Sequence, residues 1–200
     1  MAINGVIPTP EMRADALGDA NTALKLTNDD AFVLTRCAKV LAYAGQELDR
    51  ASSLVERAVT LNSNLAVAWL DRGWISVIRA EPERAIESFE KMIRLSPIDP
   101  LRPFSLSGIA FAYFFLERYE EGRTLAKEIM QLFPHQQSFV SYIVNCVGGG
   151  NLSEATNAAA ELLKFDPAFR VSRAEAIFPI RSPELREKFD GALRTAGMPE

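Results

Sequence analysis

Apolar, small and polar positions follow one another along this chain in a pattern that returns about every 34 residues. The clearest unit, 66–99, reads AVAWLDRGWISVIRAEPERAIESFEKMIRLSPID. Gly73 and Ala85 are small, which suits the close approach of two antiparallel helices, and the large side chains of Trp69 and Phe89 fill the space beside them. The unit therefore predicts a helical hairpin whose remaining apolar faces a neighbouring unit must cover.

The same unit recurs on both sides of 66–99. The small residue of each second helix serves as a marker, and the markers are Ala16, Ala51, Ala85, Gly122 and Ala155. Their separations are 35, 34, 37 and 33 residues, close to the 34-residue period of tetratricopeptide repeats. The longest step contains the Ser-Pro-Ile-Asp-Pro loop at 96–100, a turn in which extra residues cost little.

Five positions of the clearest unit match the tetratricopeptide pattern of Trp, small residue, Ala, Phe and Pro, and they are Trp69, Gly73, Ala85, Phe89 and Pro97. Arg72 and Ser76 stand where Leu and Tyr are usual. The chain thus resembles tetratricopeptide repeat proteins. The predicted fold is all-α, a right-handed superhelical solenoid of antiparallel helix pairs with capping helices at the C-terminus.

We expect a repeat array over 1–167, with full repeats at 31–64, 66–99, 103–136 and 136–167 and a lone second helix at 10–27 before them. Thr9 and Ser182, each followed by proline, are expected to cap helices. The lone helix leaves Leu17, Leu24 and Leu26 without a partner on one side. Either residues 1–9 fold over them or a second copy covers them, so a homodimer is possible.

The segment 168–200 is expected to form a helical cap, with helices at about 168–177 and 183–197. Leu185, Phe189 and Leu193 recur every four residues and so share one helix face. We expect this stripe to cover the apolar end of the fourth repeat at Leu162, Leu163 and Phe165. The alternative is that this tail occupies the aromatic groove of the array.

The repeat resemblance implies that the first helix of each pair lines a concave face, and it assigns positions to that face. The residues expected in a partner-binding groove are Phe32, Lys39, Tyr43, Leu70, Trp74, Val77, Phe104, Phe111, Phe114, Phe115, Val140 and Val144. So many apolar and aromatic groups suit an amphipathic helix or an extended apolar peptide, although any one of the phenylalanines could equally belong to the core. Only Lys39 matches the relatives that grip a terminal carboxylate, so that binding mode is not expected.

A second resemblance comes from the SPIDP loop, the FAYFFLERYEEG segment and the ending GALRTAGMPE. These segments resemble the C-terminal repeat region of bacterial adenylate cyclase-like signalling proteins. The resemblance implies that the chain is the regulatory or oligomerisation part of such a protein. None of the residues that a class III cyclase domain uses for catalysis can be matched here.

Composition narrows the classes of function. The net charge is −4, which disfavours nucleic-acid binding because that needs a basic face. The longest uncharged apolar stretch, Gly108–Leu116, is too short for a membrane span, and the start MAINGVIPTPE lacks the pattern of a signal peptide. The two cysteines, Cys37 and Cys146, are too few and too far apart for a disulfide framework. We therefore expect a cytoplasmic protein, and the second resemblance implies a bacterial one.

Four features could carry chemistry, and each has a plainer interpretation. His135, the only histidine, lies in a turn and is expected to face solvent. Ser88 and Lys91 have the Ser-x-x-Lys spacing but flank the repeat position Phe89, and Gly148–Gly150 falls at a helix turn without the Gly-Lys-Ser/Thr of a phosphate loop. Cys37 and Cys146 are expected to be buried and inert. The sequence therefore predicts a protein-binding scaffold without catalysis, cofactor or metal, in which Ser88→Ala and His135→Ala would be nearly neutral.

Overall fold

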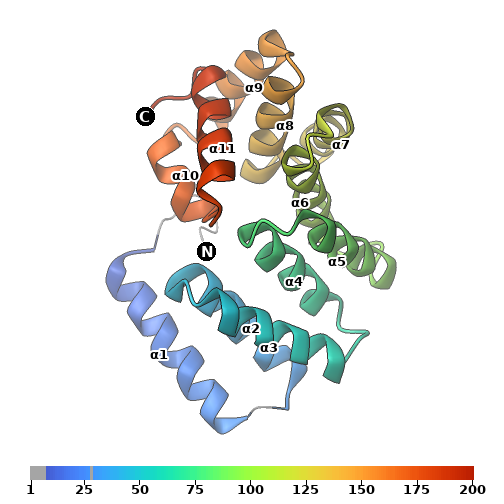
Figure 1. Ribbon diagram of the computed structural model, residues 1–200, viewed down its shortest axis with the longest axis vertical. Helices are drawn as coiled ribbons and strands as arrows, with labels where there is room; N and C mark the ends of the chain where they lie inside the picture. Colours follow the sequence, from blue (N-terminus) through green and yellow to red (C-terminus); the bar gives the residue numbers. More distant parts are fainter. Residues whose placement is uncertain (1–7, 28) are drawn as a thin grey trace.

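The computed structural model describes residues 8–27 and 29–200, which form a stack of helices (Figure 1). The elements are α1 (Pro10–Leu26), α2 (Ala31–Val40), the π-helical turn η1 (Leu41–Gly45), α3 (Leu48–Leu61), α4 (Ala66–Ile78), α5 (Pro82–Leu95), α6 (Arg102–Phe115), α7 (Tyr119–Leu132), α8 (Gln136–Gly148), α9 (Leu152–Phe165), α10 (Val171–Ile177) and α11 (Pro183–Thr195). Helices hold 77% of the described residues, which include no strand. The all-α prediction is confirmed.

Side chains at the helix starts explain where several elements begin. Thr9 Oγ1 accepts a hydrogen bond from the backbone N–H of Met12 at 3.2 Å, and Ser182 Oγ accepts one from the N–H of Leu185 at 3.3 Å. A proline follows each cap and brings the backbone dihedral that the first helical turn needs. Both predicted caps are confirmed.

The turn inside each helical hairpin has one residue in the left-handed conformation. These residues are Gln46, Ala80, Glu117 and Gly150, at separations of 34, 37 and 33 residues. In the last three turns the next residue donates its N–H to the carbonyl five positions earlier, as in Glu81 N to Ser76 O at 2.9 Å. In the first turn Glu47 reaches back six positions to Leu41, because η1 contains one additional residue. The backbone therefore repeats with the period of the sequence.

The ring of Phe89 in α5 occupies a space that two glycines leave open. A methyl group added at Gly73 of α4 would lie 2.5 Å from that ring, and one added at Gly108 of α6 would lie 2.3 Å from it. Phe89 and Ala85 are fully buried. The first helices of two successive repeats thus approach the same ring from two sides, as expected for Gly73 and Ala85 from the sequence.

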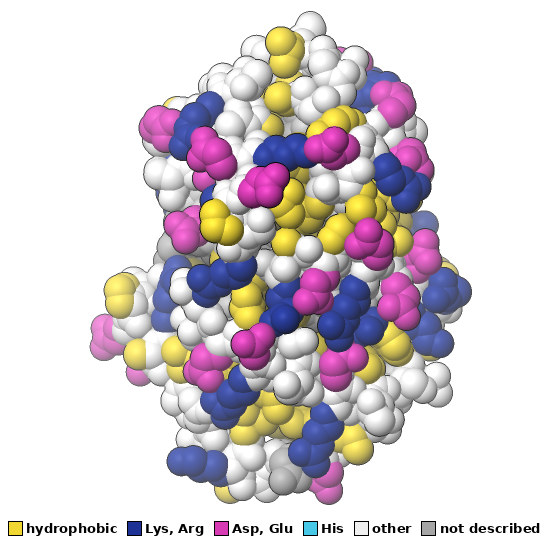
Figure 2. Space-filling view, in the orientation of Figure 1, with side chains coloured by type: hydrophobic (Ala, Val, Ile, Leu, Met, Phe, Trp, Pro, Cys, Tyr) yellow, Lys and Arg dark blue, Asp and Glu magenta, His cyan; other side chains and the backbone are white. Residues whose placement is uncertain are grey.

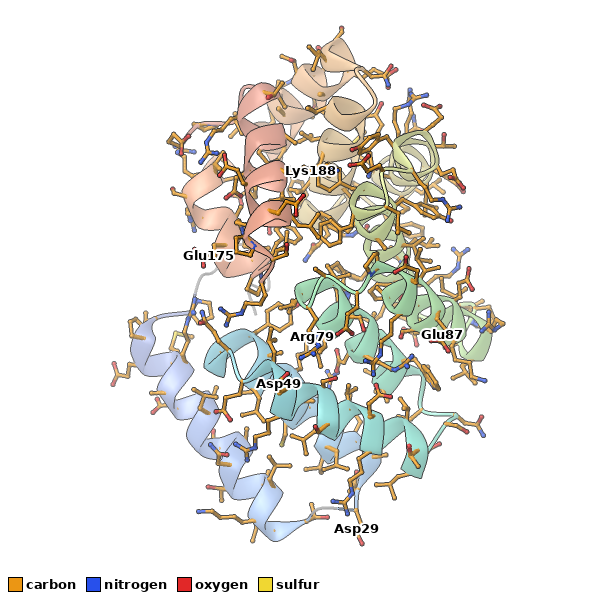
Figure 3. The ribbon with its side chains drawn as sticks, in the orientation of Figure 1. Asp29, Asp49, Arg79, Glu87, Glu175 and Lys188 are labelled. Atoms are coloured by element: carbon orange, nitrogen blue, oxygen red, sulfur yellow. The ribbon has the colours of Figure 1, made fainter. Side chains whose placement is uncertain are left out.

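Charged side chains link neighbouring helices at the surface. The ion pair between Arg79 Nη1 and Asp49 Oδ1, 2.7 Å apart, joins α4 to α3 (Figure 3). Arg72 joins three helices, since its Nε lies 2.8 Å from Glu56 Oε1 and its Nη1 donates to Ser88 Oγ at 2.9 Å. Exposed pairs of this kind contribute on the order of 0–1 kcal/mol each, so apolar packing carries most of the stability.

The lone first helix, α1, packs on α2 and η1. Leu17 and Leu24 are half-buried in this contact, while Leu26 is 82% exposed. The proposal that residues 1–9 cover α1 falls mostly outside the described residues.

The C-terminal helices lie on the aromatic face of the array, the second of the two positions considered from the sequence. Figure 1 shows α11 alongside α8, and the ring of Phe189 in α11 lies 6.1 Å from that of Phe111 in α6. Of the three residues at the end of the fourth repeat, Leu162 is fully buried and Leu163 is half-buried in the same core cluster as Phe189. Phe165 stays 53% exposed.

Two glycine substitutions test the packing around Phe89. Gly73→Leu should lower the free energy of unfolding by roughly 1–3 kcal/mol or more, because its side chain would overlap the Phe89 ring. Gly18→Ala, in the middle of α1 with open space around its Cα, should instead raise stability by roughly 0.5–1 kcal/mol through helix propensity. Denaturant unfolding measures both changes. A neutral Gly73→Leu would contradict the close approach.

Candidate functional site

The candidate site lies on the face formed by the first helices α2, α4, α6 and α8, part of which the chain's own tail covers. The ring of Phe178, which follows α10, lies 4.9 Å from Phe111 and 5.6 Å from Phe189. The backbone N–H of Arg181 donates to the carbonyl of Ile78 at the end of α4, at 3.0 Å. The tail therefore closes the half of this face that α6 and α8 form.

Lys188 of α11 forms an ion pair with Glu117, which lies in the turn between α6 and α7. Its Nζ lies 2.6 Å from Glu117 Oε1 and is within 5.4 Å of the centre of the Phe114 ring and 5.3 Å of the Tyr119 ring (Figure 3). A cation over aromatic faces is stabilised by their negative charge density.

The twelve predicted groove residues separate into three groups. Six are buried in the core and closed to a partner, and they are Val77, Phe111, Phe114, Phe115, Val140 and Val144. Phe32 lies apart from them, 53% exposed at the start of α2. The remaining five, Lys39, Tyr43, Leu70, Trp74 and Phe104, line one cavity. The tail accounts for part of this burial, because Phe178 and Phe189 pack on Phe111 and Lys188 lies over Phe114. The repeat pattern alone does not predict these contacts.

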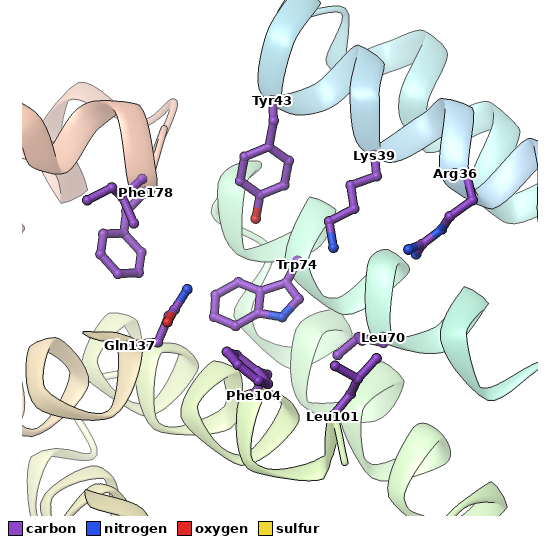
Figure 4. A pocket seen from close by; sticks show the side chains of 10 residues that line it. Arg36, Lys39, Tyr43, Leu70, Trp74, Leu101, Phe104, Gln137 and Phe178 are labelled. Atoms are coloured by element: carbon purple, nitrogen blue, oxygen red, sulfur yellow. The ribbon is translucent and has the colours of Figure 1, made fainter. Parts of the chain in front are cut away.

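The cavity that these five residues line has a volume of about 160 Å³ (Figure 4). Its other walls come from Arg36, Leu101, Gln137, Ile177 and Phe178, so α2, α4, α6, α8 and the tail all contribute. Figure 4 shows the hydroxyl of Tyr43, the amine of Lys39 and the amide of Gln137 directed toward the indole of Trp74. A cavity of roughly 150 Å³ accommodates a benzene-sized group, so this one suits one Leu- or Phe-sized side chain.

A second cavity, of about 340 Å³, lies between α1 and α2. Its lining is Pro8, Met12, Arg13, Ala16, Arg36, Lys39, Val40, Tyr43 and Ala44. Arg36, Lys39 and Tyr43 line both cavities. The π-helical turn η1 carries Tyr43 to this shared position.

Two cations at the shared edge of the cavities compete for one carboxylate. Asp71 of α4 is 1% exposed and pairs with Arg36, and its Oδ1 lies 3.2 Å from the Nζ of Lys39. Burial, and next the charge of Arg36, lower the pKa of Lys39 to about 8. The cluster thus sets two cationic side chains against one carboxylate.

Sequence reasoning named Lys39 but not Arg36 or Asp71. A signal was present, since Asp71 interrupts the apolar run of 66–78 at a place where burial requires a charged partner. No comparable feature of the sequence predicted that the tail residues Ile177 and Phe178 would line the cavity.

His135 makes more contacts than its position in a turn predicted. Its Nδ1 bonds to the carbonyl of Phe133 at 2.6 Å, its Nε2 lies 3.1 Å from the buried Ser107 Oγ, and its ring lies 4.6 Å from that of Phe104. The Nδ1–H donates to the carbonyl, so Nε2 accepts the proton of Ser107. The solvent-facing interpretation was wrong because α6 brings Ser107 and Phe104 under the turn. Neither His135 nor Ser107 lines either cavity, so this pair holds structure together.

The other chemistry candidates have structural roles. Ser88 is buried, not a surface flank, and its Oγ accepts from Arg72 and donates to the carbonyl of Arg84 at 2.7 Å. Gly148 lets the helix end approach Tyr119, whose ring would lie 2.4 Å from an added methyl group. Both cysteines are buried and unpaired, and burial raises the pKa of Cys146 to about 11, which makes its thiol unreactive.

Within residues 8–27 and 29–200, no group of His, Cys, Asp and Glu side chains could hold a metal ion, and no helix is long and apolar enough to cross a membrane. Figure 2 shows acidic and basic side chains interspersed over one face, without a separate basic patch there.

No known protein family matches this chain, and no curated protein sequence matches it. Solved structures do resemble it. PilW, a widely conserved type IV pilus biogenesis factor, superposes with a TM-score of 0.71 at 15% identity, over 94% of this chain and 82% of PilW. TTC0263, a tetratricopeptide repeat protein of Thermus thermophilus, gives 0.67 at 16% identity over 92% of each chain. YrrB, a tetratricopeptide repeat protein with an unusual peptide-binding site, gives 0.56 at 20% identity over 88% of this chain and 90% of YrrB.

The chain has the tetratricopeptide repeat fold. This confirms the repeat fold predicted from 66–99 and its neighbours. The structures just named offer no link to adenylate cyclase-like proteins, so that resemblance has no support.

The single histidine allows a clean test of its structural role. His135→Ala should lower the free energy of unfolding by roughly 1–3 kcal/mol, because Ser107 loses its partner in a buried place and Phe104 loses a neighbour. Burial lowers the pKa of His135 below 6.5, so the unfolded chain binds more protons below that pH. Wild-type stability should therefore fall from pH 6.5 downward. His135→Ala should lose that part of the pH dependence, as denaturant unfolding between pH 5.5 and 7.5 would show.

Proposed function

We propose that this protein is a non-catalytic scaffold that binds a peptide segment of a partner protein in the open part of its first-helix face. The observation that carries the proposal is the division of that face. The tail packs on Phe111 of α6, and between α2, α4, the starts of α6 and α8 and the tail itself there remains a cavity with aromatic walls and directed polar groups. Apolar pockets with a few convergent polar groups are typical of binding sites.

The fold supports this proposal in general terms. Stacked helix pairs present an extended surface, and such surfaces bind extended or helical peptides through a row of side-chain pockets. YrrB, which shares the fold, has a peptide-binding site. The segment 168–200 acts in this proposal as a cap that forms one wall of the site. Two buried, unpaired cysteines agree with a reducing compartment such as the cytoplasm.

No observation on the described residues favours the alternative that the chain regulates a cyclase.

A homodimer through α1 is a separate proposal, supported by the exposed Leu26 and Met12. Light scattering at increasing concentration should show a mass that approaches two chains. A Leu26→Ser, Met12→Ser variant should then stay monomeric. A wild-type chain of unit mass at high concentration would contradict the proposal.

The peptide site can be tested without knowing the partner. A displayed library of random peptides is selected on the wild-type protein, and enriched peptides are titrated by fluorescence anisotropy. Leu101 lines the cavity and is 39% exposed, so Leu101→Asn should weaken binding by roughly five- to tenfold without disturbing the core. Ile98→Asn is the matched control, because Ile98 lies in the same loop, is 94% exposed and lines neither cavity.

The control variant should bind within about twofold of wild type. Circular dichroism confirms that both variants stay folded. Failure to enrich any peptide, or equal weakening by the two variants, would contradict a peptide site in this cavity.

A further inference from the structure

The strongest charge feature of the molecule outside its surface ion pairs is the cluster of Arg36, Lys39 and Asp71. Only one carboxylate serves two cations, and that carboxylate is withdrawn into the core with its side chain fully covered. The Arg36 side chain is 38% exposed, and Asp71 is its only ion-pair partner in the described part of the chain. Its Nε and Nη2 are buried, so the rest of the side chain is what a ligand can meet.

The surroundings of the cluster do not supply a second anion. Arg13 is a further cation in the lining of the α1–α2 cavity, and neither cavity wall contains Asp or Glu among the described residues. Two cavities lined by cations are unusual in a chain whose net charge is −4. Their electrostatic complement is an anion.

Apart from the Tyr43 hydroxyl and the Gln137 amide, the rest of both linings is apolar. On one side of the cation pair stand Leu70, Trp74 and Phe104, and on the other stand Met12 and Val40. A group that brings only an anion would leave both apolar cavities empty. A ligand that fills them needs an anion with apolar groups on either side.

We propose that the partner peptide presents one internal Asp or Glu side chain to Arg36 and Lys39 and places an apolar side chain in each of the two cavities. This rests on the proposed peptide-binding function and names the class of its ligand. The carboxylate is an internal one because Arg36, Lys39 and Tyr43 line both cavities, so the bound chain continues past the cations in both directions. A terminal carboxylate would end the chain at the cations and leave one cavity unfilled.

Asp71 has an opposing role in this arrangement. It holds the two cations in place, and it also neutralises part of their charge. Removing its charge should therefore strengthen binding of the acidic peptide, whereas general damage to the site would weaken it. This opposite sign separates ligand recognition from folding.

The test uses synthetic peptides with blocked ends, acetylated and amidated, in which two apolar residues flank a central Glu or, in the matched probe, Gln. Enriched library sequences supply the spacing. Fluorescence anisotropy gives the dissociation constant of each probe for the full-length wild-type protein, Arg36→Gln and Asp71→Asn. A Leu101→Asn sample in parallel reports on the peptide site itself.

The dissociation constant of the wild-type protein should be lower for the Glu probe than for the Gln probe by roughly tenfold or more. This ratio should shrink in high salt. Arg36→Gln should remove most of the difference and leave the Gln probe nearly unaffected. Asp71→Asn should enlarge the difference. Circular dichroism and melting curves verify the fold of each variant.

Four outcomes overturn the proposal. Equal affinities for the Glu and Gln probes, sensitive to Leu101→Asn, leave the peptide site standing and remove its acidic specificity. If a probe whose only carboxylate is a free C-terminus binds more tightly than the Glu probe, the recognised carboxylate is a terminal and not an internal one. If a folded Asp71→Asn variant binds the Glu probe more weakly than wild type does, the charged cluster stabilises the fold and does not recognise the ligand. Absence of any binding that responds to Leu101→Asn removes the proposed function as well.

Discussion

The close approach of α4 and α6 to the ring of Phe89 is the contact on which the rest of the structure depends. The ring leaves no room for a methyl group at Gly73 or at Gly108, so two successive repeats share one aromatic side chain. From this ring a line of aromatic contacts runs outward. Trp74 lies 5.5 Å from Phe89 and 6.1 Å from Phe111, and Phe111 lies 4.9 Å from Phe178. The cavity wall and the tail are thus placed by the same packing that spaces the helices.

Much of the fold could be predicted because close packing restricts residue size at fixed intervals. Small residues at Gly73 and Ala85 and large ones at Trp69 and Phe89 are what a tight helix crossing requires, and the left-handed turns repeat with the same period. The polar residues were harder to place. Ser88 and Ser107 are buried because Arg72 and His135 from other helices satisfy them, and a single helix pattern does not reveal such partners.

The candidate site was only half predictable, for a physical reason. The stripe of Leu185, Phe189 and Leu193 predicts that α11 buries one face, but amphipathicity does not say against which surface. In the structure α11 packs on Phe111 and Phe178. Six of the predicted groove residues are buried, and the cavity lies toward α2, where the charged cluster lies.

The buried carboxylate of Asp71 is a costly feature that packing alone does not require. Removing an ionised group from water costs several kcal/mol unless partners compensate, and an apolar residue of similar size often serves stability as well or better. Here the partners, Arg36 and Lys39, stand at the edge of two cavities instead of inside the core. A residue that costs stability and orients cations toward open space is more readily explained by binding than by folding.

The burial of the tail favours a permanent wall of that site over a ligand that a partner displaces. Five of its large apolar residues, Phe169, Phe178, Ile180, Phe189 and Leu193, are at most 7% exposed. At roughly 1.5–3 kcal/mol for each buried side chain, releasing them would cost on the order of 8–15 kcal/mol before the gain in chain entropy. A peptide of micromolar affinity gains only about 8 kcal/mol in total. The bond from Val171 N to Pro199 O, 2.8 Å long, also ties the two ends of the tail together. In the proposed complex the partner therefore meets a surface that already includes Ile177 and Phe178.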